Sequence, residues 1–126
     1  MQYLLMVYEN GTVWDTMTDA EKRQISDACH EWHEDLQRRG IARGTIRLHP
    51  AASAATVRGR GGKTMLTDGP FAETKEVFGG LEIIECENQA AAAEIARTFP
   101  VLEAGFSVEI RQVMTNDEEK QHWQEE

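Results

Sequence analysis

The stretch TDGPFAETKEVFGG, from Thr67 to Gly80, has the most particular chemistry in this chain of 126 residues. Asp68 opens an Asp-Gly-Pro turn signal, and two interpretations of it stay open. In the first, its carboxylate accepts backbone amides of the turn while the glycine adopts a positive φ. In the second, the turn lies at a sheet end beside a cleft, and a desolvated Asp68 acts as a general base.

The rest of this stretch is longer than a turn requires, which makes a role at the rim of a site about as well supported as a purely structural turn. In the alternative, purely structural interpretation, the phenylalanine packs into the core and the charged residues form weak ion pairs on the surface. The paired glycines at the end lack a phosphate-loop pattern and indicate a bulge or a close backbone approach. The residues that we expect to bind a ligand here are Gly69, Pro70, Phe71, Glu73 and Lys75.

His30 and His33 lie three residues apart, so on a helix they share a face. Two imidazoles with the adjacent Glu34 could hold a metal ion, but the spacing matches neither HExxH nor a known zinc pattern. We therefore predict a solvated helix face and no metal. His33 lies nearer the apolar edge of the helix than His30 and is the better placed of the two to face a cleft.

His49 ends a predicted strand next to Pro50. At a sheet rim, a histidine with a pKa near its usual value of about 6.5 could serve as acid or base, or it could cap the chain as it turns. Arg47 precedes it by two residues and shares its face of the strand. If that face points into the protein, Arg47 and His49 would together bind an acidic substrate.

No nucleophile set is visible in the sequence: there is no GxSxG motif, and neither cysteine has an activating partner nearby. Dinucleotide fingerprints are also absent. An enzyme built on this chain would accordingly perform acid–base chemistry on a small molecule, without a tightly held cofactor.

Composition narrows the class of protein further. With 22 acids against 13 bases, the chain has a net charge of −9 and no basic stripe, which argues against nucleic-acid binding. The N-terminus lacks the features of a signal peptide, and no apolar run approaches the length of a membrane span. Cys29 and Cys86 are isolated thiols, typical of a reduced protein. We expect a cytoplasmic protein that binds neither nucleic acid nor membrane.

Hydrophobic periodicity and end signals predict the elements that position these residues. The first helix is the clearest, because Thr18 and Glu21 form a capping box and Gly40 is a natural stop. A second helix follows Asn88 and is ended by Pro100. The strands are expected at 2–8, 41–50, 79–86 and 106–114, the first helix at 18–39, a connector at 9–17, and a hairpin at 55–67 with GRGG as its turn.

This order is β-α-β, a hairpin insertion, then β-α-β, the split βαβ pattern of an α+β, ferredoxin-like fold. It predicts an antiparallel sheet with both helices on one face, in a single domain over residues 1–114. An acidic tail over 115–126 is expected to be frayed or helical on the surface. The other sheet face has no cover within the chain, so we expect a homodimer.

Several segments together resemble the YCII-related family, in its DGPF branch: YLLMVYEN, ATVR, GK, TDGPFAETKE, GG and VEIRQVM. The resemblance implies a subunit of a dimeric α/β barrel, similar to muconolactone isomerases and antibiotic-biosynthesis monooxygenases. It also implies a catalytic His–Asp pair, whose histidine falls near Cys29 or His30 here and whose aspartate is Asp68. Genes of this branch often accompany alternative sigma factors.

Two functions therefore stay open. One is proton-transfer chemistry of isomerase, dehydratase or lyase type on a small molecule, with Asp68 as base and His30 or His49 assisting. The other is a non-catalytic ligand-binding or regulatory module associated with an alternative sigma factor. A buried Asp68 beside a polar pocket would favour the first, and a protein partner would favour the second.

Overall fold

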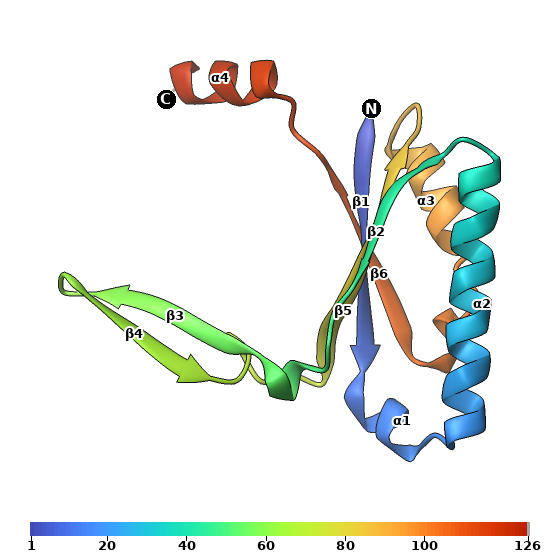
Figure 1. The fold of residues 1–126 in the computed structure, drawn as a ribbon. Coiled ribbons are helices and arrows are strands. Elements are labelled where there is room, and N and C mark those ends of the chain that lie inside the picture. The colour runs from blue at the N-terminus through green and yellow to red at the C-terminus, as the bar shows by residue number, and fades with distance from the viewer. Residues whose placement is uncertain (126) are drawn as a thin grey trace.

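The computed structural model describes residues 1–125, so residue 126 of the predicted tail lies outside it. A four-stranded antiparallel sheet carries two helices on one face, while a hairpin and a terminal helix extend away from the other face (Figure 1). The elements are β1 Gln2–Asn10, α1 Gly11–Thr16, α2 Asp19–Arg38, β2 Ala42–Arg47, β3 Ala55–Arg60, β4 Lys63–Asp68, β5 Glu76–Glu85, α3 Gln89–Arg97, β6 Phe106–Gln112 and α4 Asn116–Glu125, with short 3-10 turns at Ala51–Ser53 and Leu102–Ala104.

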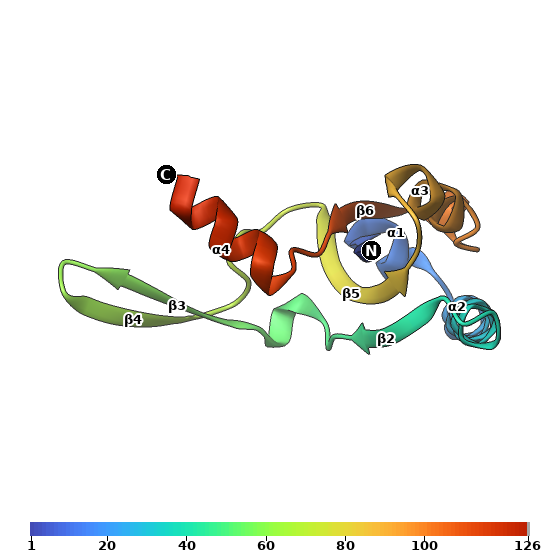
Figure 2. The same ribbon diagram turned by 90° about the horizontal axis from the view of Figure 1, so that it is seen from above.

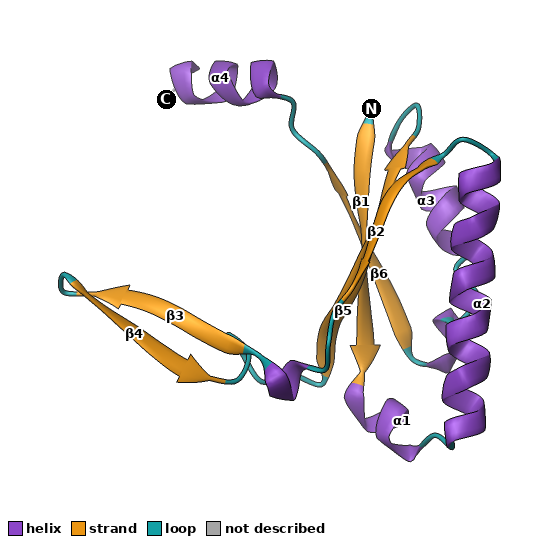
Figure 3. Cartoon of the chain, viewed as in Figure 1, coloured by secondary structure: helices purple, strands orange, loops and turns teal. Residues whose placement is uncertain are grey.

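The strand order is β2-β5-β1-β6, with β1 antiparallel to both of its neighbours. Helices α2 and α3 cover the same face of this sheet (Figure 3). This arrangement confirms the predicted α+β, ferredoxin-like fold with an inserted hairpin. None of the helices within residues 1–125 is long and apolar enough to cross a bilayer.

The start of α2 confirms the predicted capping box. The amide of Glu21 donates to Thr18 Oγ1 at 3.1 Å, and the amide of Thr18 donates to Glu21 Oε1 at 3.1 Å. Both bonds satisfy amides that the first helical turn leaves without partners. The long helix that carries His30 and His33 therefore begins where its local sequence predicts.

Three local predictions are wrong in detail. The expected connector 9–17 contains α1, because the Asn10 side chain caps it by accepting from the amides of Thr12 at 3.1 Å and Val13 at 3.4 Å. Strand β2 stops at Arg47 instead of running to 50, and β5 begins at Glu76 instead of 79.

The hairpin turn is tighter than predicted. Arg60 pairs directly with Lys63, so the turn consists of Gly61 and Gly62 alone and not of GRGG. Their φ values of +59° and +79° explain why two glycines stand there, since a two-residue loop of this kind needs left-handed backbone at both positions.

The core lies between the sheet and the two helices. Leu5 on β1, Leu36 on α2 and Ile84 on β5 are completely enclosed. Trp32 Nε1 on α2 donates to Thr98 Oγ1, just after α3, at 2.9 Å, which ties the two helices together above the sheet. These contacts hold α2 over the sheet, and a space beside the middle turns of α2, from Ile25 to His33, forms the candidate site.

The opposite sheet face is apolar along its centre. Residues directly paired across strands share a face, and the pairs Leu4–Ile83, Met6–Leu81 and Tyr8–Phe78 alternate with the buried residues. Figure 2, a view from above, shows the hairpin β3–β4 and helix α4 on this side, pointing away from α2 and α3.

Candidate functional site

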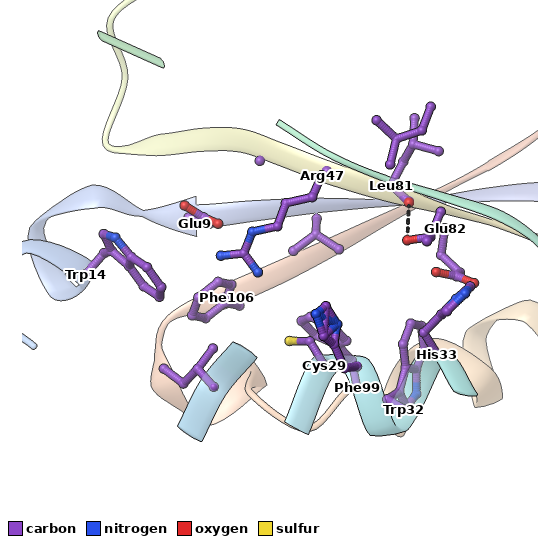
Figure 4. Close-up of a pocket in the computed structure, with 17 residues that line it drawn as sticks. Glu9, Trp14, Cys29, Trp32, His33, Arg47, Leu81, Glu82, Phe99 and Phe106 are labelled. Atoms are coloured by element: carbon purple, nitrogen blue, oxygen red, sulfur yellow. Dashed lines mark hydrogen bonds and ion pairs between the residues drawn. The ribbon is translucent and has the colours of Figure 1, made fainter. Parts of the chain in front are cut away.

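A pocket of about 160 Å³ lies between α2 and the sheet. Its walls come from β1, β2, β5 and β6 on one side and from α2 and the segment after α3 on the other (Figure 4). Polar groups lie at both ends of the lining, His33 and Glu82 at one and Glu9 and Arg47 at the other. An apolar pocket with few, well-placed polar groups is the usual form of a small-molecule site.

The His33–Glu82 pair is the most distinctive contact in the pocket. His33 Nδ1 lies 2.6 Å from Glu82 Oε1, and their side chains are only 19% and 4% exposed. Glu82 is the one charged or polar residue among those that are buried within the described chain. Helix α2 supplies the histidine and β5 the carboxylate, so the pair joins segments 49 residues apart.

Burial raises the pKa of the Glu82 carboxyl above its usual value, because the surroundings disfavour the charged form. Contacts with His33 and with the hydroxyl of Thr45 work in the opposite direction and lower it. The net direction is upward, so proton binding at Glu82 is shifted toward neutral pH. Groups in this state are typical of acid–base sites.

This raised pKa predicts a measurable pH dependence. Between the unfolded pKa of about 4.3 and the raised folded pKa, the folded state holds more protons, so stability falls as pH rises. A Glu82→Gln variant lacks this loss of stability, so its melting temperature relative to wild type should rise as the pH rises through the raised pKa of Glu82. Thermal denaturation across pH measures the difference. The exposed Glu87→Gln variant serves as control, and an equal trend in both variants would refute the assignment.

The other end of the pocket combines Glu9 and Arg47. Burial raises the pKa of the Glu9 carboxyl, and the positive charge of Arg47 opposes that rise. Figure 4 shows the guanidinium of Arg47 reaching from the sheet toward Phe106. Within residues 1–125 this guanidinium makes no hydrogen bond or close ion pair, so it can receive an anionic ligand.

Aromatic rings line the middle of the pocket. Phe106 meets Trp14 edge-on at 6.2 Å between ring centres and also packs against Phe99 at 6.4 Å. Cys29 lies beside them, and burial raises the pKa of its thiol, so it stays protonated at neutral pH. The middle of the pocket therefore offers flat apolar surface and no thiolate nucleophile.

Two of the predicted site residues, Arg47 and His30, line this pocket, although His30 is exposed. His49 lies outside it and lines a neighbouring hollow that also includes Arg47 and Glu9. Strand β2 ends at Arg47, before His49, and the binding of an acidic substrate by these two residues stays a prediction. His33, the histidine nearer the apolar edge, is the one that meets a carboxylate.

Asp68 lies at the end of β4, exposed and away from the pocket. Within residues 1–125 its carboxylate accepts no hydrogen bond, so it does not cap the turn either. The turn is held instead by Gly69, with a φ of +101°, whose amide donates to the Ala54 carbonyl at 2.6 Å. A hydrogen bond of 2.9 Å from Thr56 Oγ1 to the Gly69 carbonyl adds to it. The catalytic role of Asp68 stays a prediction.

The remaining predicted ligand residues surround the base of the hairpin. Phe71, 76% exposed, follows Pro70 and plugs no core; the Arg58 guanidinium lies 5.2 Å from its ring centre. Glu73 and Lys75 line a small hollow against the start of α1. A ligand-binding role for Gly69, Pro70, Phe71, Glu73 and Lys75 is untested by this arrangement and stays a prediction.

Sequence reasoning missed Glu82 and Glu9 as site residues. The sequence does place Glu82 in the core, because in GGLEIIEC it lies two residues before the buried Ile84 and therefore on the same face of the strand. A charged residue at a core position needs a partner, and the partner is His33. Across residues 1–125 the structure gathers no cluster of three or more His, Cys, Asp or Glu side chains suited to a metal ion.

Comparisons with known proteins place the chain in a family. Residues 1–117 match the family model described as the YCII-related domain. An uncharacterized protein of Rhizobium meliloti (strain 1021) is 32% identical over 97 residues, covering 77% of this chain and 78% of that protein. A solved structure of 5-chloro-2-hydroxyhydroquinone dehydrochlorinase from Burkholderia phenoliruptrix AC1100, in complex with 2,5-dihydroxybenzoquinone, has a similar fold, with a TM-score of 0.53, 13% identity and coverage of 93% and 97% of the two chains. On the family match over residues 1–117, this chain belongs to the YCII-related domain family.

Proposed function

We propose that this protein catalyses a proton-transfer reaction on a small anionic ring compound, with His33 and Glu82 as the acid–base pair. The contact of 2.6 Å between His33 Nδ1 and Glu82 Oε1, in a pocket with aromatic walls, is the observation that carries the proposal. A histidine held by a carboxylate through one ring nitrogen is poised to use the other.

The mechanism follows from the donor and acceptor sites of imidazole. When Glu82 accepts the Nδ1 proton, Nε2 carries the lone pair and acts as the base. After Nε2 takes a proton from the substrate, the imidazolium is stabilised by the adjacent carboxylate, and the same nitrogen can return the proton elsewhere on the substrate. Isomerisation and elimination both need these two steps.

Arg47 would bind the anionic group of the substrate, at the end of the pocket away from His33. On β2 it lies opposite Gly80, two residues beyond the Thr45–Glu82 pair. Positions two apart on a strand are separated by roughly 6.6 Å, about the width of a six-membered ring with one substituent. A planar ring between the aromatic walls would thus place its carboxylate or phenolate at Arg47 and a reacting carbon near His33.

The dehydrochlorinase of similar fold supports this proposal only by analogy. Its name describes an elimination from a chlorinated hydroxyhydroquinone, and its structure holds a dihydroxybenzoquinone. At 13% identity the likeness concerns the fold alone. The residues His33, Glu82 and Arg47 carry the argument for this chain.

The proposal predicts separate effects for the two ends of the pocket. Benzoate, salicylate, catechol and hydroquinone, with benzamide as a neutral analogue, are tested by calorimetry and by deuterium uptake from D₂O measured with NMR. Arg47→Met should weaken binding of the anionic compounds about tenfold, while Arg43→Met on the same strand should not. His33→Gln should slow proton exchange at least ~100-fold with binding retained.

Three results would count against the proposal. Equal binding of anionic compounds by wild type and Arg47→Met would remove Arg47 as the anion site. Unchanged exchange in His33→Gln, with an effect of Asp68→Asn instead, would return the catalytic role to Asp68. Binding without any exchange in wild type would favour a ligand-binding module.

We also propose that the protein is a homodimer formed through the open sheet face. The central pairs Leu4–Ile83 and Met6–Leu81 on that face leave apolar surface without cover from α2 or α3, and Ile46 beside them is 51% exposed. Burying such surface against a second copy is favourable. A cytoplasmic location and an association with an alternative sigma factor stay predictions from the sequence.

A further inference from the structure

Glu9 lines the pocket, but the proposed acid–base pair gives it no role. On β1 it follows Val7 by two residues and the enclosed Leu5 by four, so its side chain points from the same face of the sheet into the pocket. The side chain is half-buried, yet within residues 1–125 its carboxylate accepts no hydrogen bond and forms no close ion pair. A carboxylate partly withdrawn from water is stabilised by a donor, and here a ligand can supply one.

Two glycines on β5 let Glu9 and Arg47 face the same space. Gly80 is paired with Val7 of β1 on one side and with Arg47 of β2 on the other. The pairing with β1 skips Gly79, which forms a bulge. A Cβ at Gly79 would lie 2.8 Å from Glu9 Oε1, so the carboxylate lies directly over that glycine. Figure 4 shows the two charged groups at the same end of the pocket.

An anionic group alone is an incomplete match for this end of the pocket. Burial raises the pKa of the Glu9 carboxyl and the positive charge of Arg47 opposes that rise, although the two groups form no close ion pair. An anionic oxygen bound at Arg47 would therefore lie near a like charge, which is unfavourable. A hydroxyl next to that oxygen removes the conflict, because it donates to Glu9 while the anionic oxygen accepts from Arg47.

The size and walls of the pocket indicate what carries these two oxygens. The pocket has a volume of about 160 Å³, and a cavity of about 150 Å³ holds one benzene ring. Trp14 and Phe106 supply flat walls at this end. Oxygens on adjacent carbons of a single ring point to the same side, so they can meet Arg47 and Glu9 together, whereas oxygens on opposite carbons cannot.

We propose that the substrate is a single ring with two hydroxyls on adjacent carbons, a compound of the catechol class. One hydroxyl releases its proton to the solvent and binds as a phenolate at Arg47, and the other keeps its proton and donates to Glu9. This inference rests on the proposed function and names its substrate class. It makes Glu9 a specificity-determining residue, beside the acid–base pair His33 and Glu82.

Calorimetry near neutral pH with catechol, 2-methoxyphenol, resorcinol and benzoate tests the inference. Wild type should bind catechol at least about tenfold more tightly than 2-methoxyphenol, which has a methyl group in place of the donated proton, or resorcinol, whose hydroxyls are not adjacent. Bound catechol should show the red-shifted ultraviolet absorption of a phenolate. Arg47→Met should abolish this absorption, and Glu9→Gln should retain it.

Glu9→Gln should change the affinities for two ligands in opposite directions. It should weaken catechol binding about fivefold, because a neutral acceptor replaces a charged one. It should tighten benzoate binding about threefold, because the like charge is gone. Gly79→Ala keeps both charges but displaces the Glu9 carboxylate, so it should also lower the preference for catechol. Asp15→Asn, an exposed acid of the neighbouring hollow, is the matched control and should change neither affinity.

The outcomes separate this inference from the proposed function. If wild type bound none of the ring compounds, both would be overturned. If it bound benzoate, but catechol no better than 2-methoxyphenol, only the catechol class would be lost. A Glu9→Gln variant that shifted both affinities in the same direction, or an Asp15→Asn variant with the same effects, would remove Glu9 as the residue that selects the substrate.

Discussion

Replacing His33 by alanine is expected to lower the free energy of unfolding by about 3 kcal/mol at neutral pH, because it strands a charge in the interior. Glu82 is 4% exposed at its side chain and has its closest partner, at 2.6 Å, in His33. Breaking a buried pair usually costs about 3–5 kcal/mol, and the lower end applies since the His33 side chain is 19% exposed.

The pH dependence of that loss identifies its cause. Burial raises the pKa of Glu82, so lowering the pH protonates the carboxyl and removes the stranded charge. The deficit of His33→Ala should accordingly shrink as pH falls through this raised pKa. Urea denaturation at several pH values gives the free energies directly.

Two further variants test the same pair. His30→Ala, three residues earlier on α2 and exposed, should cost less than about 0.5 kcal/mol. The double variant His33→Leu/Glu82→Leu should be close to wild type in stability, since apolar groups of similar size replace a buried ion pair at little cost. If His30→Ala and His33→Ala were equally harmful, the pair would have no special role.

Gly80→Ala should lower the free energy of unfolding by about 1–3 kcal/mol, the range expected when a side chain is forced into a packed site. A Cβ at position 80 would lie 2.6 Å from the carbonyl oxygen of Ile46 and 3.4 Å from the Cα of Arg47. Both atoms belong to the backbone of β2, so the edge strand itself must move. The shift would also carry Arg47 away from its place in the pocket.

Gly79→Ala provides the comparison for this prediction. A Cβ there would lie 2.8 Å from Glu9 Oε1, the end of a flexible side chain. That side chain can turn aside, so the stability loss should be smaller than for Gly80→Ala, as measured by urea denaturation. Equal losses in the two variants would show that the approach of β2 to Gly80 is not what the glycine permits.

Local signals in the sequence predicted most of the fold. The capping box of Thr18 and Glu21 marked the start of α2, and the order of strands and helices indicated the ferredoxin-like sheet. The six-residue helix α1 was not predicted, because Asn10 followed by glycine is as typical of a turn as of a helix N-cap. Signals carried by a few neighbouring residues can be read from sequence.

The site was predicted only in part, because its central contact is not local. His33 and Glu82 are 49 residues apart and meet only when α2 packs on β5. Arg47 was singled out from its place near a strand end, and it lines the pocket. The most distinctive motif drew attention to Asp68, yet it is Gly69 of that motif that fixes the base of the hairpin, through its hydrogen bonds with Ala54 and Thr56. A long motif marks a constraint on the chain without saying whether that constraint is chemical or architectural.

The central place of β1 governs the order in which this protein can fold. It is synthesised before both of its partners, β5, which ends at Glu85, and β6, which ends at Gln112. Leu5 cannot be enclosed until β6 has been synthesised, because its cross-strand neighbours are Glu82 and Ile110. Pairing such distant strands costs loop-closure entropy before any stabilising contact forms. Folding is therefore slow and concerted. The apolar strand β1 therefore stays unpaired during synthesis until β5 and β6 have been made.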